Sequence, residues 1–357
     1  MMGPTQQSLA RQRQKSNVKD ISDMGSAEKQ QQVKAVTSND SVWPVDKQVN
    51  PYLTQIKELK TNLRGGGMRM AATLELHDYP IGGLAVHPTK MVAATASDDY
   101  NWKLFTVPTG EVLMIGEGHK QWLAGIDFHP DGSKLATGSG DNTVRVWNFE
   151  KSVCEHMFAE HQAPVWSVNY HWSGNFLASA SDDETVKIWD LGSLRCRQTL
   201  YGHKSAVNSV EFLAYSNTML TSSADMTISL WDARVGLCGH TFFGHMHAVN
   251  AATFNQQGTL IASCDSFGDV KIWDVRKQQV INSLTIGAHA ANDLCFDPTG
   301  SIVAVAANDG SVKIIELQSS RLGSLAGHQD AVQAVSFDRR GQCLLSAGSD
   351  GTVRVWT

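Results

Sequence analysis

The chain has 357 residues and a formal net charge of −5 at neutral pH. It is long enough to bury a sizeable core, and it lacks the basic excess of a chain whose main surface binds nucleic acid or an anionic membrane. No apolar run approaches the roughly 18 residues of a membrane span, and the N-terminus has no apolar signal region, so we expect a soluble protein that is not secreted. The six cysteines form no C-x-x-C pair and are expected to be reduced.

Residues 1–66 are predicted to form a disordered tail, because residues 1–50 are rich in Gln, Ser, Lys and Asp and contain one aromatic residue, Trp43. Leu or Ile at positions 53, 56, 59 and 63 predicts a short amphipathic helix at 51–63, which is marginal in water without a partner. This helix either docks onto a partner, as a coiled-coil stub would, or packs on the chain's own folded domain. The basic stretch Arg11–Lys15 either contacts an acidic surface such as a tubulin tail or is solvated.

From residue 77 onward the sequence repeats with a period of about 42 residues. Histidine occupies the repeat position in six of seven units, with Gly287 in the sixth: His77, His119, His161, His203, His245 and His328. Aspartate lies 22 residues after six of these seven positions, and tryptophan lies 28 residues after five of them. Periods of this length that run from Gly-His to Trp-Asp are typical of the blades of WD-repeat propellers. The segment from Gly202-His203 to Trp231-Asp232 is the clearest example.

Each unit has the alternating apolar pattern of short strands separated by turn residues. In the fourth unit we expect strands at 206–212, 219–223 and 227–231, and the segment 196–200 is the kind that supplies a fourth strand. Seven such units predict an all-β, seven-bladed WD-repeat β-propeller over residues 67–357. The last unit ends after its third strand, so a strand at 68–76 is expected to complete this blade and close the ring.

The recurring polar residues resemble the hydrogen-bond networks of WD repeats, in which Trp donates to Ser or Thr, followed by His and then Asp. The residues that match this network are Trp147, Thr137, His119 and Asp141; Trp189, Ser179, His161 and Asp183; Trp231, Thr221, His203 and Asp225; and Trp356, Ser346, His328 and Asp350. A buried indole, hydroxyl, imidazole and carboxylate each need a partner, and this order satisfies all four. Because the set recurs around the ring, we interpret it as structural rather than as a catalytic dyad.

Three units depart from the network. Phe105 replaces Trp in the first, Phe267 replaces Asp in the fifth, where Asp265 is the alternative partner of His245, and the sixth has lost most of the set. The histidines are dispersed one per unit, no cysteine lies at zinc-ligand spacing, and no phosphate-binding loop motif occurs. We therefore predict no catalytic residue, no metal site, no cofactor and no enzyme activity.

Partner binding is expected at the mouth of the central channel, where the first strand of each unit begins. Trp122 and Trp166 lie three and five residues after the histidines of their units, and Asn208, Asn250 and Asn292 each lie five after the repeat position. Exposed tryptophans are enriched at binding hot spots; the alternative is that these rings only pack between blades. Trp172 is expected in a turn on the opposite face.

Several less common features resemble the sperm-associated antigen 16 family, WD-repeat proteins of the axonemal central apparatus of motile cilia. They include Tyr100-Asn-Trp-Lys103, Gly244-His-Met-His247, Ser263-Cys-Asp265 and the degenerate sixth unit. The resemblance covers residues 68–357. It implies a non-enzymatic scaffold in the bridge between the two central microtubules, needed for motility, with axonemal central-apparatus proteins as partners. The direct contact is left open between tubulin and another protein of the bridge.

The same resemblance implies a location in the cytoplasm, within the cytoskeleton of the cilium or flagellum. Members of that family carry a long N-terminal coiled coil, which the 66-residue tail of this chain does not match. A generic WD-repeat adaptor, such as a ubiquitin-ligase substrate receptor or a nuclear-complex subunit, is the alternative function.

Overall fold

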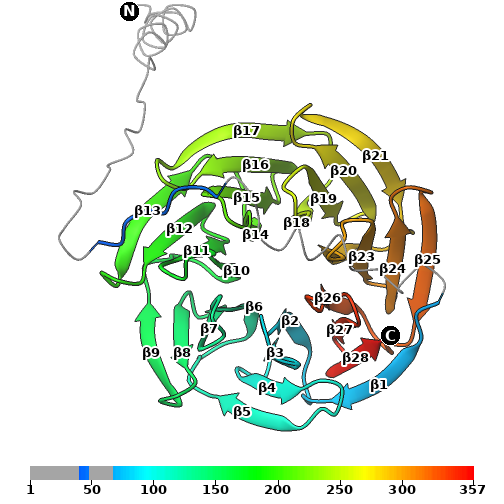
Figure 1. Ribbon diagram of the computed structural model, residues 1–357, viewed down its shortest axis with the longest axis horizontal. Helices are drawn as coiled ribbons and strands as arrows, with labels where there is room; N and C mark the ends of the chain where they lie inside the picture. The colour runs from blue at the N-terminus through cyan, green and yellow to red at the C-terminus, as the bar shows by residue number, and fades with distance from the viewer. Residues whose placement is uncertain (1–39, 48–66) are drawn as a thin grey trace, which may run out of the picture. The chain divides into compact units, whose positions relative to one another are not determined.

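The computed structural model describes residues 40–47 and 67–357 of the chain. The second range contains the strands β1 to β28, which form seven four-stranded sheets. These sheets are arranged as the blades of a closed ring (Figure 1). The prediction of an all-β, seven-bladed propeller is confirmed, whereas the expected helix at 51–63 and the basic stretch at 11–15 lie outside the described residues.

In six blades the four strands follow one another in sequence from the ring axis outward. Blade one comprises β2 (Ile81–Val86), β3 (Val92–Ser97), β4 (Trp102–Thr106) and β5 (Val112–Gly116). Blade two comprises β6 (Leu123–Phe128), β7 (Lys134–Ser139), β8 (Val144–Asn148) and β9 (Val153–Phe158). Blade three comprises β10 (Val165–Tyr170), β11 (Phe176–Ser181), β12 (Thr185–Asp190) and β13 (Arg195–Tyr201).

The remaining blades continue around the ring. Blade four comprises β14 (Val207–Phe212), β15 (Thr218–Ser223), β16 (Thr227–Asp232) and β17 (Leu237–Phe243). Blade five comprises β18 (Val249–Phe254), β19 (Leu260–Asp265), β20 (Asp269–Asp274) and β21 (Gln279–Thr285). Blade six comprises β22 (Ala291–Phe296), β23 (Ile302–Ala307), β24 (Ser311–Glu316) and β25 (Arg321–Ala326). Blade seven comprises β26 (Val332–Phe337), β27 (Leu344–Gly348), β28 (Thr352–Trp356) and β1 (Met70–Glu75).

The apolar core lies between adjacent blades. Buried side chains form seven clusters, and the cluster between blades three and four contains Ile188 of β12 and Phe212 of β14. The second strand of blade three, β11, has all its side chains buried because neighbouring sheets cover both of its faces. The outermost strand of blade five, β21, leaves most of its side chains exposed. Each blade is therefore stabilised mainly by the two blades beside it.

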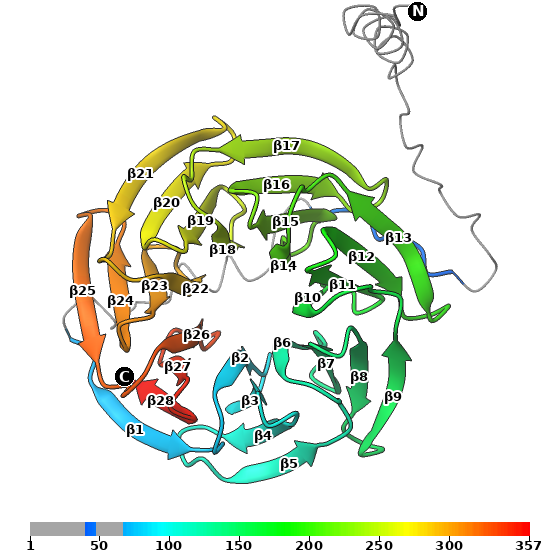
Figure 2. The same ribbon diagram turned by 180° about the vertical axis from the view of Figure 1, so that it is seen from behind.

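The ring is closed by a strand from the start of the propeller sequence. β1 pairs in antiparallel fashion with β28, with Leu74 opposite Val353. Arg69 and Thr357 exchange two backbone hydrogen bonds, of 2.8 and 2.9 Å. Figure 2 shows β1 on the outer side of β28. This pairing covers the polar edge that β28 would otherwise present to other chains.

Residues 40–47, which we call the strap, lie against the propeller. The prediction that residues 1–66 form one disordered tail is therefore wrong for them. Trp43 stacks on Phe176 with ring centroids 3.8 Å apart, and Ser41 donates from its backbone N and its Oγ to Asp190 over 2.7 Å each. The strap, dark blue in Figure 1, crosses β13. The composition predicted disorder because a single aromatic residue in a polar stretch forms no periodic apolar pattern. The residues that Trp43 contacts lie far away in the sequence, so a local pattern could not reveal them.

Candidate functional site

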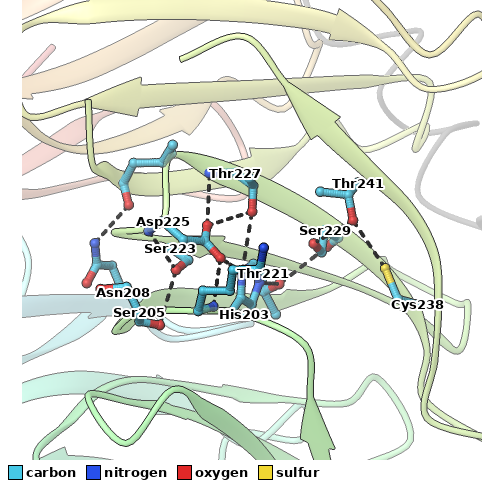
Figure 3. Close-up of polar contacts among 12 residues, drawn as sticks. His203, Ser205, Asn208, Thr221, Ser223, Asp225, Thr227, Ser229, Cys238 and Thr241 are labelled. Carbon is cyan, nitrogen blue, oxygen red and sulfur yellow. Dashed lines mark hydrogen bonds and ion pairs between the residues drawn. The ribbon is translucent and has the colours of Figure 1, made fainter. Parts of the chain in front are cut away.

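Blade four shows the buried network that the repeat residues form (Figure 3). His203 lies with Nδ1 2.8 Å from Oδ2 of Asp225 and with Nε2 2.7 Å from Oγ1 of Thr221. Trp231 donates its Nε1–H to the same Thr221 oxygen over 2.9 Å. The structure brings together the matching residues of blades two, three and seven in the same order: His119, Thr137, Asp141 and Trp147; His161, Ser179, Asp183 and Trp189; and His328, Ser346, Asp350 and Trp356.

The donors and acceptors of this network have one consistent assignment. A carboxylate only accepts, so Nδ1 of the histidine carries the proton that it donates to aspartate. Nε2 then accepts the hydroxyl proton, and the hydroxyl oxygen accepts from the indole. Burial lowers the pKa of His119 and His161 and outweighs the aspartate beside each ring, which keeps both rings neutral.

The aspartate of the network also fixes the turn between the second and third strands. Asp225 accepts from Oγ1 of Thr227 over 2.6 Å and from its backbone N over 3.0 Å. Burial alone would raise the pKa of Asp225, but hydrogen bonds from His203, Thr227 and the backbone N of Lys204 bring the pKa below its ordinary range. The network thus holds the ionised carboxylate of Asp225 for a structural purpose.

Blade five keeps the network through a different aspartate. Oδ2 of Asp265 lies 2.9 Å from Nδ1 of His245, whereas Phe267, at the usual position, is 57% exposed. Ser263 lies 2.7 Å from Nε2 of His245 and accepts from Trp273 over 2.8 Å. The alternative partner of His245 is therefore the one that the structure uses.

The other two unusual blades lose polar groups instead. In blade one, His77 contacts Asp99 and Thr95, at 2.6 and 2.9 Å, without an indole donor. In blade six, Val305 and Ile315 are fully buried apolar residues at the hydroxyl and indole positions. The apolar replacement in blade six leaves neither residue with a polar group that needs a partner, and it costs little stability.

Asn208, Asn250 and Asn292 tie adjacent blades together at one end of the ring. Each donates its Nδ2–H over 2.8 Å to a backbone carbonyl of the next blade, on Val249, Ala291 and Val332. Figure 3 shows the amide of Asn208 engaged in this way. These residues, predicted to bind a partner, therefore also join blades four, five, six and seven.

Trp122 and Trp166 lie beside each other in blades two and three. Their ring centroids are 4.6 Å apart with an interplanar angle of 32°, and Trp166 is 40% exposed. A Cβ atom at Gly140 would come within 2.6 Å of the Trp122 ring, so only glycine leaves room for this ring position. The rings pack between blades, as the alternative interpretation expected, and Trp166 also stays accessible.

One cavity of about 800 Å³ brings the five predicted partner-binding residues together. It lies at the end of the ring where the innermost strands β6 and β10 begin, and we call it the channel mouth. Its lining also includes Asp98 and Asp293. The channel mouth is an accessible, polar and aromatic hollow of the size that a peptide segment or a protruding side chain of another protein fills.

The innermost strands also carry three carboxylates that were not predicted. Asp127, Glu211 and Asp293 each accept from a backbone N–H of the next blade, over 2.7, 3.0 and 3.0 Å. Burial raises the pKa of Asp127 and Glu211 to about 7 and the pKa of Asp293 to about 6. An acidic residue inside an otherwise alternating apolar strand was the available signal for them.

The opposite end of the ring is partly covered by the strap. Trp172 lies just after β10, whereas Trp166 lies near the start of this strand, so the two occupy opposite ends of it. Nζ of Lys47 lies 4.9 Å from the Trp172 ring and 5.0 Å from the Tyr215 ring. Trp172 is thus a contact of the strap and unsuitable as an inert control residue.

Within residues 40–47 and 67–357 there is no helix with the length and apolar character needed to cross a membrane. The same residues contain no group of three or more His, Cys, Asp or Glu placed to hold a metal ion. The cysteines are free thiols. Burial raises the pKa of Cys264 and Cys295 well above the ordinary value, so both thiols are protonated.

Comparison with known families agrees with this geometry. The sequence model of the family "WD domain, G-beta repeat" matches six segments, at residues 110–148, 152–190, 194–232, 236–274, 280–316 and 319–357. Each segment spans the outermost strand of one blade and the three inner strands of the next. The remaining unit, β1 to β4, has Phe105 in place of the repeat tryptophan.

Curated relatives match shorter parts of the chain. Sperm-associated antigen 16 protein from Mus musculus is 42% identical over 122 residues, which are 34% of this chain and 17% of that protein. The Homo sapiens protein of the same name gives the same identity and coverage. Flagellar WD repeat-containing protein Pf20 from Chlamydomonas reinhardtii is 48% identical over 48 residues, or 13% of this chain and 8% of that protein. The expected resemblance to the sperm-associated antigen 16 family is confirmed over these segments.

Proposed function

Because the chain belongs to the WD-repeat family of β-propellers, we propose that it is a non-enzymatic protein-interaction scaffold of the ciliary or flagellar axoneme. In its finer form, the proposal places the protein in the bridge of the central apparatus, where it supports motility by holding other central-apparatus proteins. Support comes from the segments similar to sperm-associated antigen 16 and to the flagellar protein Pf20. The location proposed is therefore the axonemal cytoskeleton.

The observation that carries the proposal is the channel mouth. It combines two tryptophans, three rim asparagines and a cavity of about 800 Å³, which fits protein–protein contact better than covalent chemistry. Aromatic residues in a partly desolvated hollow are the usual anchors of protein interfaces. The histidine–aspartate pairs that could suggest catalysis are enclosed in the blades and recur in six of them.

The test is incorporation of a tagged chain into axonemes of a motile ciliated cell, followed by detergent extraction. We expect the wild-type chain to remain with the extracted axoneme and the Trp122→Ala/Trp166→Ala double variant to be lost from it. Phe243→Ala is the control, because this side chain is 75% exposed on β17 and away from the channel mouth. Crosslinking of the retained protein identifies its neighbours and tests tubulin as one of them.

The alternatives predict different outcomes. A chain that is soluble after extraction, or concentrated in the nucleus, would favour the generic adaptor and contradict the axonemal proposal. A double variant that folds and is retained as well as Phe243→Ala would contradict the channel mouth as the binding site.

A further inference from the structure

The lining of the channel mouth has a one-sided charge. It includes the carboxylates of Asp98 and Asp293 and contains no Lys, Arg or His among the described residues. The lining at the other end of the channel contains Arg339 together with Asp127, Glu211 and Asp293. Asp98 is exposed, and the described part of the chain gives its carboxylate no hydrogen bond. The channel mouth therefore presents an exposed carboxylate, and no cationic side chain in its lining offsets this charge.

The rim asparagines add further acceptors. Their Nδ2 atoms are committed to backbone carbonyls at 2.8 Å, and within the described residues no hydrogen bond involves their Oδ1 atoms. The next blade thus fixes the orientation of each amide, and the amide oxygen remains available to accept a hydrogen bond. Asn208, Asn250 and Asn292 offer three such oxygens to a ligand that donates several hydrogen bonds.

The tryptophan pair supplies an aromatic surface in the same cavity. Trp122 is held between the backbone of Gly140 and the ring of Trp166, and Trp166 is 40% exposed. A cation within about 6 Å of such a ring is attracted by its electron-rich face. Carboxylate, amide oxygens and indole faces together favour one kind of ligand, a cation with several N–H donors on an apolar stem.

We propose that the channel mouth binds an arginine or lysine side chain projecting from a basic segment of a protein partner. This inference rests on the proposed function, in which the channel mouth is the partner site, and it adds the chemistry of the partner. An acidic segment, such as a glutamate-rich tail, is disfavoured there because Asp98 would repel it. Asp98 would attract the cation, and the indole rings and amide oxygens would orient it.

The test measures binding of fluorescein-labelled peptides to the full chain by anisotropy at low ionic strength. One 12-residue peptide contains three arginines separated by Gly and Ser, a second carries citrulline in their place, and a third carries glutamate. We expect the arginine peptide to bind at least about tenfold more tightly than the citrulline peptide, which has the same shape without the charge. Added salt should weaken binding of the arginine peptide more than binding of the citrulline peptide.

Two charge variants locate the site. Asp98 and Asp182 occupy the same repeat position, 21 residues after His77 and His161, and both are exposed, but only Asp98 lines the cavity. Asp98→Asn should weaken binding of the arginine peptide by about three- to tenfold. Asp182→Asn removes the same charge and should change this binding by less than about twofold. Both variants should unfold at the wild-type temperature.

Three results would overturn the inference: no preference for arginine over citrulline, tighter binding of the glutamate peptide, or equal effects of the two charge variants. If these occur while the tryptophan double variant still loses its place in the axoneme, the partner chemistry is wrong and the proposed function stands. If the arginine preference and the Asp98 effect are found while the double variant remains in the axoneme, the cation site stands and its role as the axonemal anchor is wrong.

Discussion

Asp265 binds His245 from a position two residues before the one that aspartate occupies in the other blades. The Oδ2–Nδ1 distance is 2.9 Å, as in blade two, where the partner of His119 comes from the usual position. Oδ1 of Asp265 also accepts from the backbone N of Phe267 and of Asp269, at 3.0 and 2.9 Å. One carboxylate thus satisfies the histidine and shapes the turn that leads into β20.

Asp265→Ala is expected to destabilise the propeller, whereas Phe267→Ala is not. The first change removes the acceptor of His245 and of two backbone N–H groups, at a cost of about 1–3 kcal/mol, which lowers the melting temperature by roughly 3–8 °C. The second removes a side chain that is 57% exposed. Thermal unfolding followed by circular dichroism measures both, and equal melting temperatures would contradict the role given to Asp265.

Trp43→Ala is expected to release the strap from blades three and four. The indole stacks on Phe176, and Asn217 donates to the Pro44 carbonyl over 2.8 Å. Amides of the strap and of the turns at 171–175 and 213–217 should then exchange with deuterium roughly tenfold faster. Val42→Ala is the control because Val42 is 82% exposed. Unchanged exchange in the Trp43 variant would show that the strap does not depend on this contact.

Deletion of residues 1–66 should leave a folded ring, and deletion of residues 1–76 should not. The longer deletion removes β1 and leaves β28 as an unpaired edge, which favours aggregation. Size-exclusion chromatography and a melting curve distinguish the two outcomes. A monomer of residues 77–357 that melts cooperatively would mean that the pairing of β1 with β28 is dispensable for closure.

Glu211→Gln is expected to stabilise the protein more at high pH than at low pH. Burial raises the pKa of Glu211 to about 7 in the folded state, against about 4.5 when unfolded. The unfolded state therefore loses its proton first as the pH rises, and stability declines between about pH 4.5 and pH 7. Glutamine cannot ionise and keeps an oxygen to accept from Phe254. The gain in melting temperature should be a few degrees at pH 8.5 and near zero at pH 4.5.

A parallel gain at both pH values would indicate that the pKa of Glu211 is ordinary. A buried histidine changes the stability of the whole protein with pH in the opposite direction. Burial lowers the pKa of His171 to about 4, so its contribution to stability is lost as the pH falls below about 6.5, where the unfolded state begins to bind the proton. Comparing Glu211→Gln with the wild type at each pH cancels this common effect.

The sequence alone was sufficient for the number of blades and for the members of the buried networks in blades two, three, four and seven. Each repeat carries its own strands, turns and polar residues within 42 positions, so that His203 and Asp225 are placed by local spacing alone. The same spacing left open whether Asp265 replaces the aspartate that is missing at position 267. The course of the turn into β20 decided this, because it brings the Asp265 carboxylate to the ring of His245.

Only the tertiary structure decided the features that join distant parts of the chain. Trp43 stacks on Phe176, which lies more than a hundred residues away in the sequence. Trp122 contacts Trp166 because blades two and three lie side by side. The pKa of Glu211 is likewise set by burial at the ring axis, which no local pattern encodes. A repeat pattern determines what each blade contains, since those contacts are local. The contacts of the strap and the channel mouth involve several blades at once, and their chemistry therefore depends on how the blades are arranged around the ring.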